Sequence, residues 1–218
     1  RNPEFGDDNA AWKAANVCRM LDQTETKPAT VMEVGCGGGG ILVELSKRLP
    51  DHTLFTGYEP MPEAYAKCTE RQTDRIQFFQ ESVDSTPDQS FDVVLCLDVF
   101  EHIEDPWTFL RNLKQWGKRF IFHIPLDLSA QMVLRDEPLI RVRKKVGHIH
   151  YYSRSLALAL LEECGFSIVD SFYTRAWETG YSTLSFRLAT LPRKILFAVA
   201  PDFTVRLLGG FPFMVCAE

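Results

Sequence analysis

An acidic residue stands next to a glycine-rich run near the start of the chain. The segment VMEVGCGGGGILVEL places Glu33 two positions before Gly35, and Gly35, Gly37 and Gly40 fit the pattern G-x-G-x-x-G. Such a loop between a strand and a helix lets backbone N–H groups approach a ligand closely. The carboxylate of Glu33 would repel a pyrophosphate, so it favours a ligand with a cationic ammonium group, such as the amino-acid part of S-adenosylmethionine. A tight turn without a ligand is the alternative.

A second acidic residue has the spacing of a ribose-binding group. Glu59 follows Gly37 by 22 residues, in LFTGYEPMPEAY. At the end of a strand, a carboxylate at this spacing accepts hydrogen bonds from both ribose hydroxyls. A solvated acid at a strand end is the alternative. Four further residues are expected around the adenosine part of the same ligand: Pro60, Met61, Glu81 and Ser82.

Histidines are the natural general bases in this chain because they titrate near neutrality. His148 and His150, in GHIHYYS, are the catalytic candidates, since the chain returns there to the carboxyl edge of the predicted sheet. Asp127 is a candidate acidic partner, and no metal is expected. His123, inside a predicted strand, is expected to be a satisfied core histidine. Catalysis by proximity alone, without a base, is the alternative.

Short apolar runs alternate with helical patterns along most of the chain. The order strand, helix, strand implies a parallel sheet with right-handed crossovers and helices on both faces. The continuous apolar run 91–97 is typical of a strand covered on both faces, so it is expected in the middle of the sheet. The stretch 126–152 is expected to be irregular. The predicted strands are 31–34, 53–58, 76–79, 91–97, 119–124 and 166–171. Helices are expected at 10–21, 41–49, from Pro62, at 106–116 and at 153–164.

The composition is that of one globular domain, with 218 residues, 45% of them hydrophobic, and a net charge of -5. A net negative charge gives no overall field to hold a nucleic-acid backbone, so no nucleic-acid partner is expected. The six cysteines lie far apart with no C-x-x-C pair, which disfavours a disulfide framework or a zinc site and favours the cytoplasm. We interpret residues 1–7 as a cloning remnant or disordered start, and 8–218 as a single domain with substrate-side insertions at 126–152 and 176–209.

The ordered motifs resemble those of the class I S-adenosylmethionine-dependent methyltransferases. The resemblance rests on Glu33-x-Gly35-x-Gly37, on Glu59 and Glu81, and on FDVVLCLDVFEHIEDPWTFLRNL; GHIHYYSRSLALALLEECGF resembles the branch acting on small molecules, quinones, lipids and glycans. It implies a Rossmann-like, seven-stranded, mostly parallel sheet whose last strand, for which 210–218 is the candidate, is antiparallel. It implies S-adenosyl-L-methionine as cofactor, held by Glu33, Gly35, Cys36, Gly37, Gly39, Glu59, Pro60, Met61, Glu81, Ser82, Asp98, Val99 and His102.

The activity implied by this resemblance is methyl transfer, with an oxygen of a small-molecule, glycan or lipid-linked acceptor as the expected target. The segment LDVF after the run 91–97 lacks the Asn/Asp-Pro-Pro-aromatic motif of enzymes that methylate amino groups of nucleic-acid bases. Two alternatives stay open. One is an NAD-binding oxidoreductase, which Glu33 disfavours, and the other is a non-enzymatic module that kept the fold.

Two segments combine apolar and basic residues. The segment 126–147 is either a solvated helix face or a cover over the acceptor whose basic end meets a phosphate or carboxylate. The segment 190–208 is expected to form two short helices, broken at Pro201 and ended by Gly209. It packs on the domain, mediates dimerisation or makes a peripheral membrane contact. The oligomeric state is left open.

Overall fold

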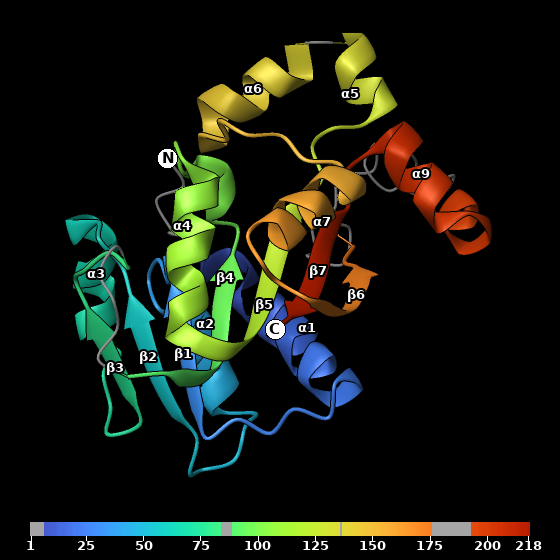
Figure 1. The fold of residues 1–218 in the computed structure, drawn as a ribbon. Coiled ribbons are helices and arrows are strands. Elements are labelled where there is room, and N and C mark those ends of the chain that lie inside the picture. Colours follow the sequence, from blue (N-terminus) through green and yellow to red (C-terminus); the bar gives the residue numbers. More distant parts are fainter. Residues whose placement is uncertain (1–6, 84–88, 136, 176–192) are drawn as a thin grey trace.

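The structure is a computed structural model that describes residues 7–83, 89–135, 137–175 and 193–218. Its strands are β1 (Thr30–Val34), β2 (Leu54–Tyr58), β3 (Ile76–Phe79), β4 (Phe91–Leu97), β5 (Gly117–Pro125), β6 (Ile168–Tyr173) and β7 (Pro212–Ala217). They form one seven-stranded sheet in the order β3-β2-β1-β4-β5-β7-β6 (Figure 1). Only β7 runs antiparallel to its neighbours, β5 and β6. The predicted sheet with an antiparallel last strand is therefore confirmed.

Helices cover both faces of the sheet (Figure 1). On one face, α1 (Ala10–Gln23), α2 (Gly40–Ser46) and α3 (Pro62–Thr69) share a core with the strands. On the other face, α4 (Pro106–Leu113) and α7 (Arg154–Glu163) do the same. Three short 3-10 helices, η1 (Asp7–Asn9), η2 (Phe100–His102) and η3 (Lys114–Trp116), join these elements. One apolar core thus packs on each face of the sheet, and the two cores together fix the positions of the strand ends.

The middle of the sheet is the most deeply buried part of the chain. Strand β4 lies between β1 and β5, and Val93, Val94 and Leu95 are fully buried. The expectation that 91–97 lies mid-sheet is confirmed. Strand β6 begins two residues later than predicted, because Phe166 packs its ring against Phe120 and Phe122 as part of the core before the strand starts.

Two helix starts follow directly from their capping residues. The Asp105 side chain accepts a hydrogen bond from the backbone N–H of Thr108 at 3.1 Å, and Pro106 occupies the first turn of α4. The Ser153 hydroxyl accepts from the N–H of Leu156 at 3.4 Å at the start of α7. Such caps satisfy N–H groups that the helix itself leaves without partners. The predicted beginnings of both helices are confirmed.

The expectation of an irregular stretch at 126–152 is wrong. It contains two helices, α5 (Ala130–Arg135) and α6 (Glu137–Val146), which lie beyond the carboxyl ends of the parallel strands (Figure 1). Neither helix has a buried side chain. Helix α6 carries apolar and basic residues at helical spacing, in line with the alternative of a solvated helix face at 126–147, and neither helix contributes a residue to the two cores.

The tail forms two helical pieces, as expected, in the part that the structure describes. Residues 193–199 are helical, and α9 (Pro201–Leu208) follows and ends at Gly209. Residues 176–192, including the expected helix start at Pro192, lie outside the described residues. Among the described residues, no helix has the length and apolar character needed to cross a membrane.

Candidate functional site

Three adjoining cavities lie at the carboxyl ends of β1, β2 and β4, and Gly35 borders all three. Gly35 has a φ of +63°, and a Cβ added there would come within 3.0 Å of a methyl group of Val99. Glycine is therefore required both by the left-handed backbone and by the close approach of the loop to the end of β4. We name the cavities the acidic, middle and apolar compartments.

The acidic compartment has a volume of about 370 Å³ and gathers charged groups around the glycine loop. Glu33, only 1% exposed, is its most deeply buried acid. A buried carboxylate here suits a cationic group of a ligand, and loop N–H groups suit an anionic one, so an amino acid fits both. The lining includes Lys13, Glu33, Gly35, Cys36, Gly37, Asp98, His102 and His148.

The middle and apolar compartments continue from this end. The middle compartment, about 580 Å³, is lined by residues that include Glu59, Pro60, Met61, Asp98, Val99, His102, Lys144 and Lys145. The apolar compartment, about 370 Å³, is lined by residues that include Val34, Pro60, Glu81, Ser82, Val83, Val99 and Phe109. The depression therefore passes from charged, through mixed, to mainly apolar surroundings.

Glu59 ties the end of β2 to the glycine loop. One carboxylate oxygen accepts a hydrogen bond from the backbone N–H of Gly37 at 2.8 Å, and the other accepts from that of Met61 at 2.9 Å. Burial raises the pKa of Glu59, while these two backbone hydrogen bonds oppose the shift. Each oxygen keeps a second lone pair, so the carboxylate can still accept from ligand hydroxyls in the middle compartment.

Asp98, directly after β4, is held between two cationic or ionisable side chains. Lys13 Nζ lies 2.7 Å from one carboxylate oxygen and His123 Nδ1 lies 2.6 Å from the other. Burial alone would raise the pKa of Asp98, but His123 and Lys13 outweigh it and hold this pKa well below its usual range. The backbone φ of Asp98 is +58°, a conformation uncommon outside glycine. Lys13, on α1, is a site residue that the sequence analysis did not include.

His123 is buried, and its second ring nitrogen lies 2.9 Å from the Thr174 hydroxyl. The prediction of a satisfied core histidine is confirmed.

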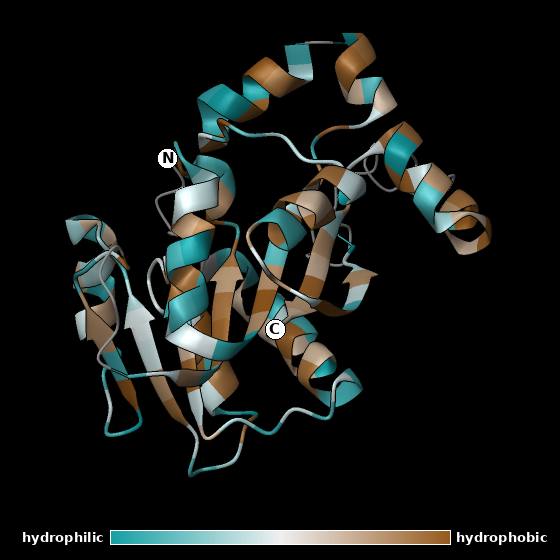
Figure 2. Cartoon of the chain, viewed as in Figure 1, coloured by the Kyte–Doolittle hydropathy of each residue, from teal (hydrophilic) through white to brown (hydrophobic). Residues whose placement is uncertain are grey.

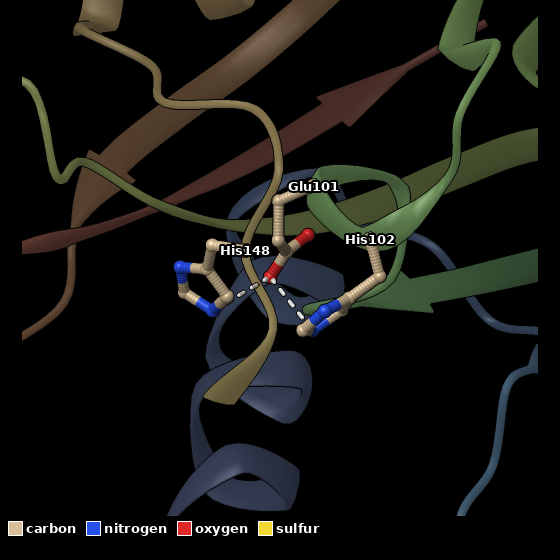
Figure 3. Close-up of side chains that lie close together, drawn as sticks. All are labelled: Glu101, His102 and His148. Carbon is tan, nitrogen blue, oxygen red and sulfur yellow. Dashed lines mark ion pairs between the residues drawn. The ribbon is translucent and has the colours of Figure 1, made fainter. Parts of the chain in front are cut away.

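Glu101, in η2, is fully buried beside two histidines (Figure 3). One carboxylate oxygen lies 4.0 Å from Nε2 of His102 and 3.9 Å from Nε2 of His148. No hydrogen-bond partner for this carboxylate occurs among the described residues. Burial, followed by the charge of Asp98, raises the pKa of Glu101 well above its usual value. Each of the three side chains offers one nitrogen or oxygen atom that can bind a metal ion, and these atoms lie within 4.8 Å of one another. A cation or polar group at this point would therefore meet all three side chains.

His148 forms a tight pair with Asp127. Its Nδ1 lies 2.6 Å from an oxygen of Asp127, and the ring borders the acidic compartment. A carboxylate only accepts hydrogen bonds, so Nδ1 donates to Asp127; in the neutral imidazole, Nε2 is then the acceptor. His102 is held by the Gly147 carbonyl, 3.1 Å from its Nδ1.

Two predicted site residues do not border the three compartments. Gly39 caps α2 with a φ of +79° and packs so closely on Phe78 that an added Cβ would lie 2.5 Å from its ring. His150 donates its backbone N–H to the Glu101 carbonyl, and its ring lies beside that of Tyr152. All other predicted site residues border at least one compartment.

Comparison with known proteins identifies the family to which the chain is similar. Residues 9–171 match the family described as "Methyltransferase domain". The ubiquinone biosynthesis O-methyltransferase of Aeromonas salmonicida is 33% identical over 132 residues, which cover 55% of this chain and 54% of that protein. The corresponding Yersinia enterocolitica enzyme is 35% identical over 92 residues, or 40% of this chain and 38% of its own length. The chain thus spans about half the length of these relatives, or less.

Solved structures share the fold at low sequence identity. Magnesium protoporphyrin IX methyltransferase from Synechocystis, with bound S-adenosylhomocysteine, superposes with a TM-score of 0.62 at 16% identity, covering 95% of this chain and 82% of that one. A putative sarcosine dimethylglycine methyltransferase from Galdieria sulphuraria gives 0.63 at 16% identity, covering 94% and 83%. The family match spans the strands and loops that build the three compartments. The chain therefore belongs to the methyltransferase-domain family, with the fold of the class I S-adenosylmethionine-dependent methyltransferases.

Proposed function

We propose that this chain transfers a methyl group from S-adenosyl-L-methionine to an oxygen of a small-molecule, glycan or lipid-linked acceptor. One observation carries the proposal: His148, oriented by Asp127, borders the same compartment as Glu33 and the glycine loop. A cofactor site and a candidate base for an acceptor hydroxyl therefore meet in one cavity. The named O-methyltransferase activity of the relatives supports the choice of oxygen.

The three compartments fit the three parts of the cofactor in order. Glu33 would pair with the ammonium group, and the N–H groups of the loop would meet the carboxylate. Glu59 would accept from the ribose hydroxyls, with Pro60 and Met61 beside it. The adenine would enter the apolar compartment between Val83 and Val99, with Glu81 and Ser82 at its polar edge.

The cofactor supplies a methyl group already activated by its sulfonium sulfur, so the protein mainly aligns donor and acceptor. Such alignment contributes roughly 7–11 kcal/mol to lowering the barrier. His148 Nε2 takes the acceptor proton, and Asp127 keeps the imidazole in the required tautomer and orientation. Asp98, held by Lys13 and His123, fixes the end of β4 beneath the acceptor. His150 contacts the Glu101 backbone and borders none of the three compartments, so we assign the base to His148 alone.

Cofactor binding is tested first by titration calorimetry with S-adenosylmethionine, S-adenosylhomocysteine and NAD. We expect binding of the first two and not of NAD. Glu33→Gln removes the charge without changing the shape, and we expect it to weaken S-adenosylmethionine by about tenfold or more. Equal affinity of Glu33→Gln and the unmodified chain would contradict the proposed orientation of the cofactor.

Turnover is tested by incubating extracts of small metabolites, glycans and lipids with cofactor labelled in its methyl group. Mass spectrometry of the labelled product then locates the methyl on oxygen, nitrogen or carbon. His148→Gln should reduce turnover about 10²- to 10⁴-fold while cofactor affinity stays unchanged. His52→Gln, at an exposed turn, is the matched control. If the chain binds the cofactor but labels no compound in any of the three extracts, a non-enzymatic module would be favoured.

A chelator distinguishes two uses of the cluster in Figure 3. If His148 acts as the base, EDTA leaves turnover unchanged. Loss of turnover with EDTA, and its recovery with zinc or manganese, would instead assign Glu101, His102 and His148 to holding a cation, since imidazole suits zinc and carboxylate suits manganese. The six free cysteines, five of them buried, further support a reducing compartment, and we place the protein in the cytoplasm.

A further inference from the structure

Four helical pieces beyond the carboxyl edge of the sheet form one connected body (Figure 1). We name it the helical crest: α5, α6, residues 193–199 and α9. The Gln131 side chain of α5 donates to the Leu208 carbonyl at the end of α9. Arg193 donates to the same carbonyl at 3.1 Å. Gly209 also packs against Ser129, just before α5. These contacts join α5, residues 193–199 and α9 to one another, and α6 follows α5 directly in the chain.

This surface carries most of the exposed large apolar side chains. Of the thirteen found among the described residues, eight belong to the crest, and Leu134 and Val199 are 86% and 81% exposed. Brown and teal segments alternate along α5, α6 and α9 in Figure 2. Exposed apolar patches of this kind mark sites of interaction, because burying them is favourable. The eight residues are Val133, Leu134, Ile140, Val146, Ile195, Val199, Phe203 and Leu207.

Positive charge accompanies the apolar residues on α6. Its last turns carry Arg141, Arg143, Lys144 and Lys145, in a chain whose net charge is -5. Arg141 pairs with Glu137 at 2.8 Å. For the other three, no acidic partner lies within ion-pair distance in the described part of the chain. Ile140, Arg141, Lys144 and Lys145 border one shallow hollow with Glu137, so apolar and basic side chains share a side of the helix.

We propose that the helical crest docks on an anionic lipid surface. Aliphatic side chains mixed with unneutralised cations fit the boundary between acyl chains and negatively charged headgroups. A nucleic acid would use the cations but leave the aliphatic side chains in water. An amphipathic, basic helix without a single buried residue, such as α6, is typical of an interfacial helix.

Docking in this way would bring the cofactor cavity to the lipid surface. Lys144, Lys145 and Val146, at the end of α6, also border the middle compartment. An acceptor with an apolar anchor could therefore reach the cavity without leaving the membrane. This consequence for the acceptor rests on the proposed function, whereas the docking itself does not.

The test is flotation of the full chain with vesicles, in the absence of cofactor and acceptor. Vesicles of phosphatidylcholine alone are compared with an equal mixture of phosphatidylcholine and phosphatidylglycerol, at low and high salt. We expect binding to the mixed vesicles that weakens with salt, and at least tenfold weaker binding to neutral ones. The variant Arg143→Glu/Lys144→Glu/Lys145→Glu should lower binding to mixed vesicles by tenfold or more. The variant Leu134→Ser/Ile140→Ser should lower it at both salt concentrations.

The control for position is Lys27→Glu/Leu54→Ser at the opposite edge of the sheet, which reverses one exposed charge and changes one exposed aliphatic residue, against three charges and two aliphatic residues in the crest variants. It should float like the unmodified chain. Equal flotation of the crest variants and this control overturns the proposal. So does salt-sensitive binding of duplex DNA with no binding of vesicles, or a dimer in sedimentation that the crest variants abolish. Circular dichroism of each variant detects misfolding. Cofactor titration of the unmodified chain and of Leu134→Ser/Ile140→Ser, whose residues do not border the three compartments, separates failure of the proposed function from failure of docking.

Discussion

The glycine loop and the helical crest both lie at the carboxyl edge of the sheet, yet their side chains are held in opposite ways. In the loop, Glu33 is buried, Gly35 has a left-handed φ and lies close against Val99, and Glu59 is fixed by two backbone hydrogen bonds. In the crest, α5 and α6 bury no side chain. Contacts within the molecule therefore fix the positions of the side chains at the proposed cofactor site. Within the crest, α9 buries Thr204 and Val205, so α5 and α6 are the parts that lie free of the core.

The largest difference between the two regions should appear in the free energy of unfolding. Phe100, just after β4, is fully buried and its ring packs edge-on against Phe122 and Tyr152. Phe100→Ala should cost about 3–5 kcal/mol, because it removes apolar contact and leaves a cavity. Phe203→Ala makes the same change in α9, where the ring is 57% exposed, and should cost within about 0.5 kcal/mol. Urea denaturation of both variants measures the difference, and similar losses would show that the crest is part of the core.

Next in size is the effect of removing the carboxylate that holds the loop. Glu59→Ala leaves the N–H groups of Gly37 and Met61 without their acceptor and removes the proposed ribose contact. A hydrogen bond to a charged group contributes about 1.5–3 kcal/mol, so cofactor affinity should fall roughly 10- to 100-fold. Titration calorimetry with S-adenosylhomocysteine gives the affinity. Glu63→Ala, on the nearby helix α3, is the control and should bind normally. Unchanged affinity of Glu59→Ala would remove this residue from the cofactor site.

The same contrast explains what could be predicted from the sequence. The strands β1 to β5 and the starts of α4 and α7 follow from apolar runs and capping residues, which are local patterns tied to a buried core. The spacing of Glu59 brings its carboxylate to the glycine loop for the same reason, since β2 lies directly beside β1. Helices α5 and α6 were predicted less well: helix at 126–147 was only one of two interpretations, and because the two helices bury no side chain, no apolar run tied to a core marks their bounds.

Tertiary placement accounts for the rest of what the sequence did not reveal. Lys13 lies on an otherwise apolar face of α1, and only the packing of α1 on the sheet brings it to Asp98. An acid in the turn after β4 is usually solvated, so the complete burial of Glu101 was not predictable. The polar residue that interrupts the pattern of α1 was the one available signal, because a lysine beside buried alanines needs a partner.

The contribution of Asp98 to the free energy of unfolding should depend on pH. Its folded pKa is lowered, so the unfolded chain binds more protons near pH 4, and the stabilisation from ionised Asp98 is present above about pH 4 and lost as the pH falls below it. Because 30% of its side chain is exposed, we discount the effect of its ion pairs and expect Asp98→Asn to cost about 1–2 kcal/mol at pH 7. The cost should shrink below pH 4. Asp74→Asn, at an exposed turn, should show no such dependence. A cost of Asp98→Asn that stays constant from pH 7 to pH 3 would contradict this account.

Glu137 provides the corresponding test in the crest, with the smallest expected effect on stability. Arg141 lowers the pKa of Glu137 through a hydrogen bond and its charge, as Lys13 and His123 do for Asp98, but this pair is fully exposed on α6. Solvent and salt screen such a pair, so Glu137→Gln should leave the melting temperature unchanged within error. The same change removes the one acidic side chain of α6, and one additional net charge should strengthen binding to phosphatidylglycerol-containing vesicles about fivefold. Measured side by side, Glu137→Gln should change flotation but not the melting temperature, whereas Asp98→Asn should lower the melting temperature. A clear fall in the melting temperature of Glu137→Gln with no gain in vesicle binding would mean that α6 is held by its own ion pair and not shaped for a charged surface.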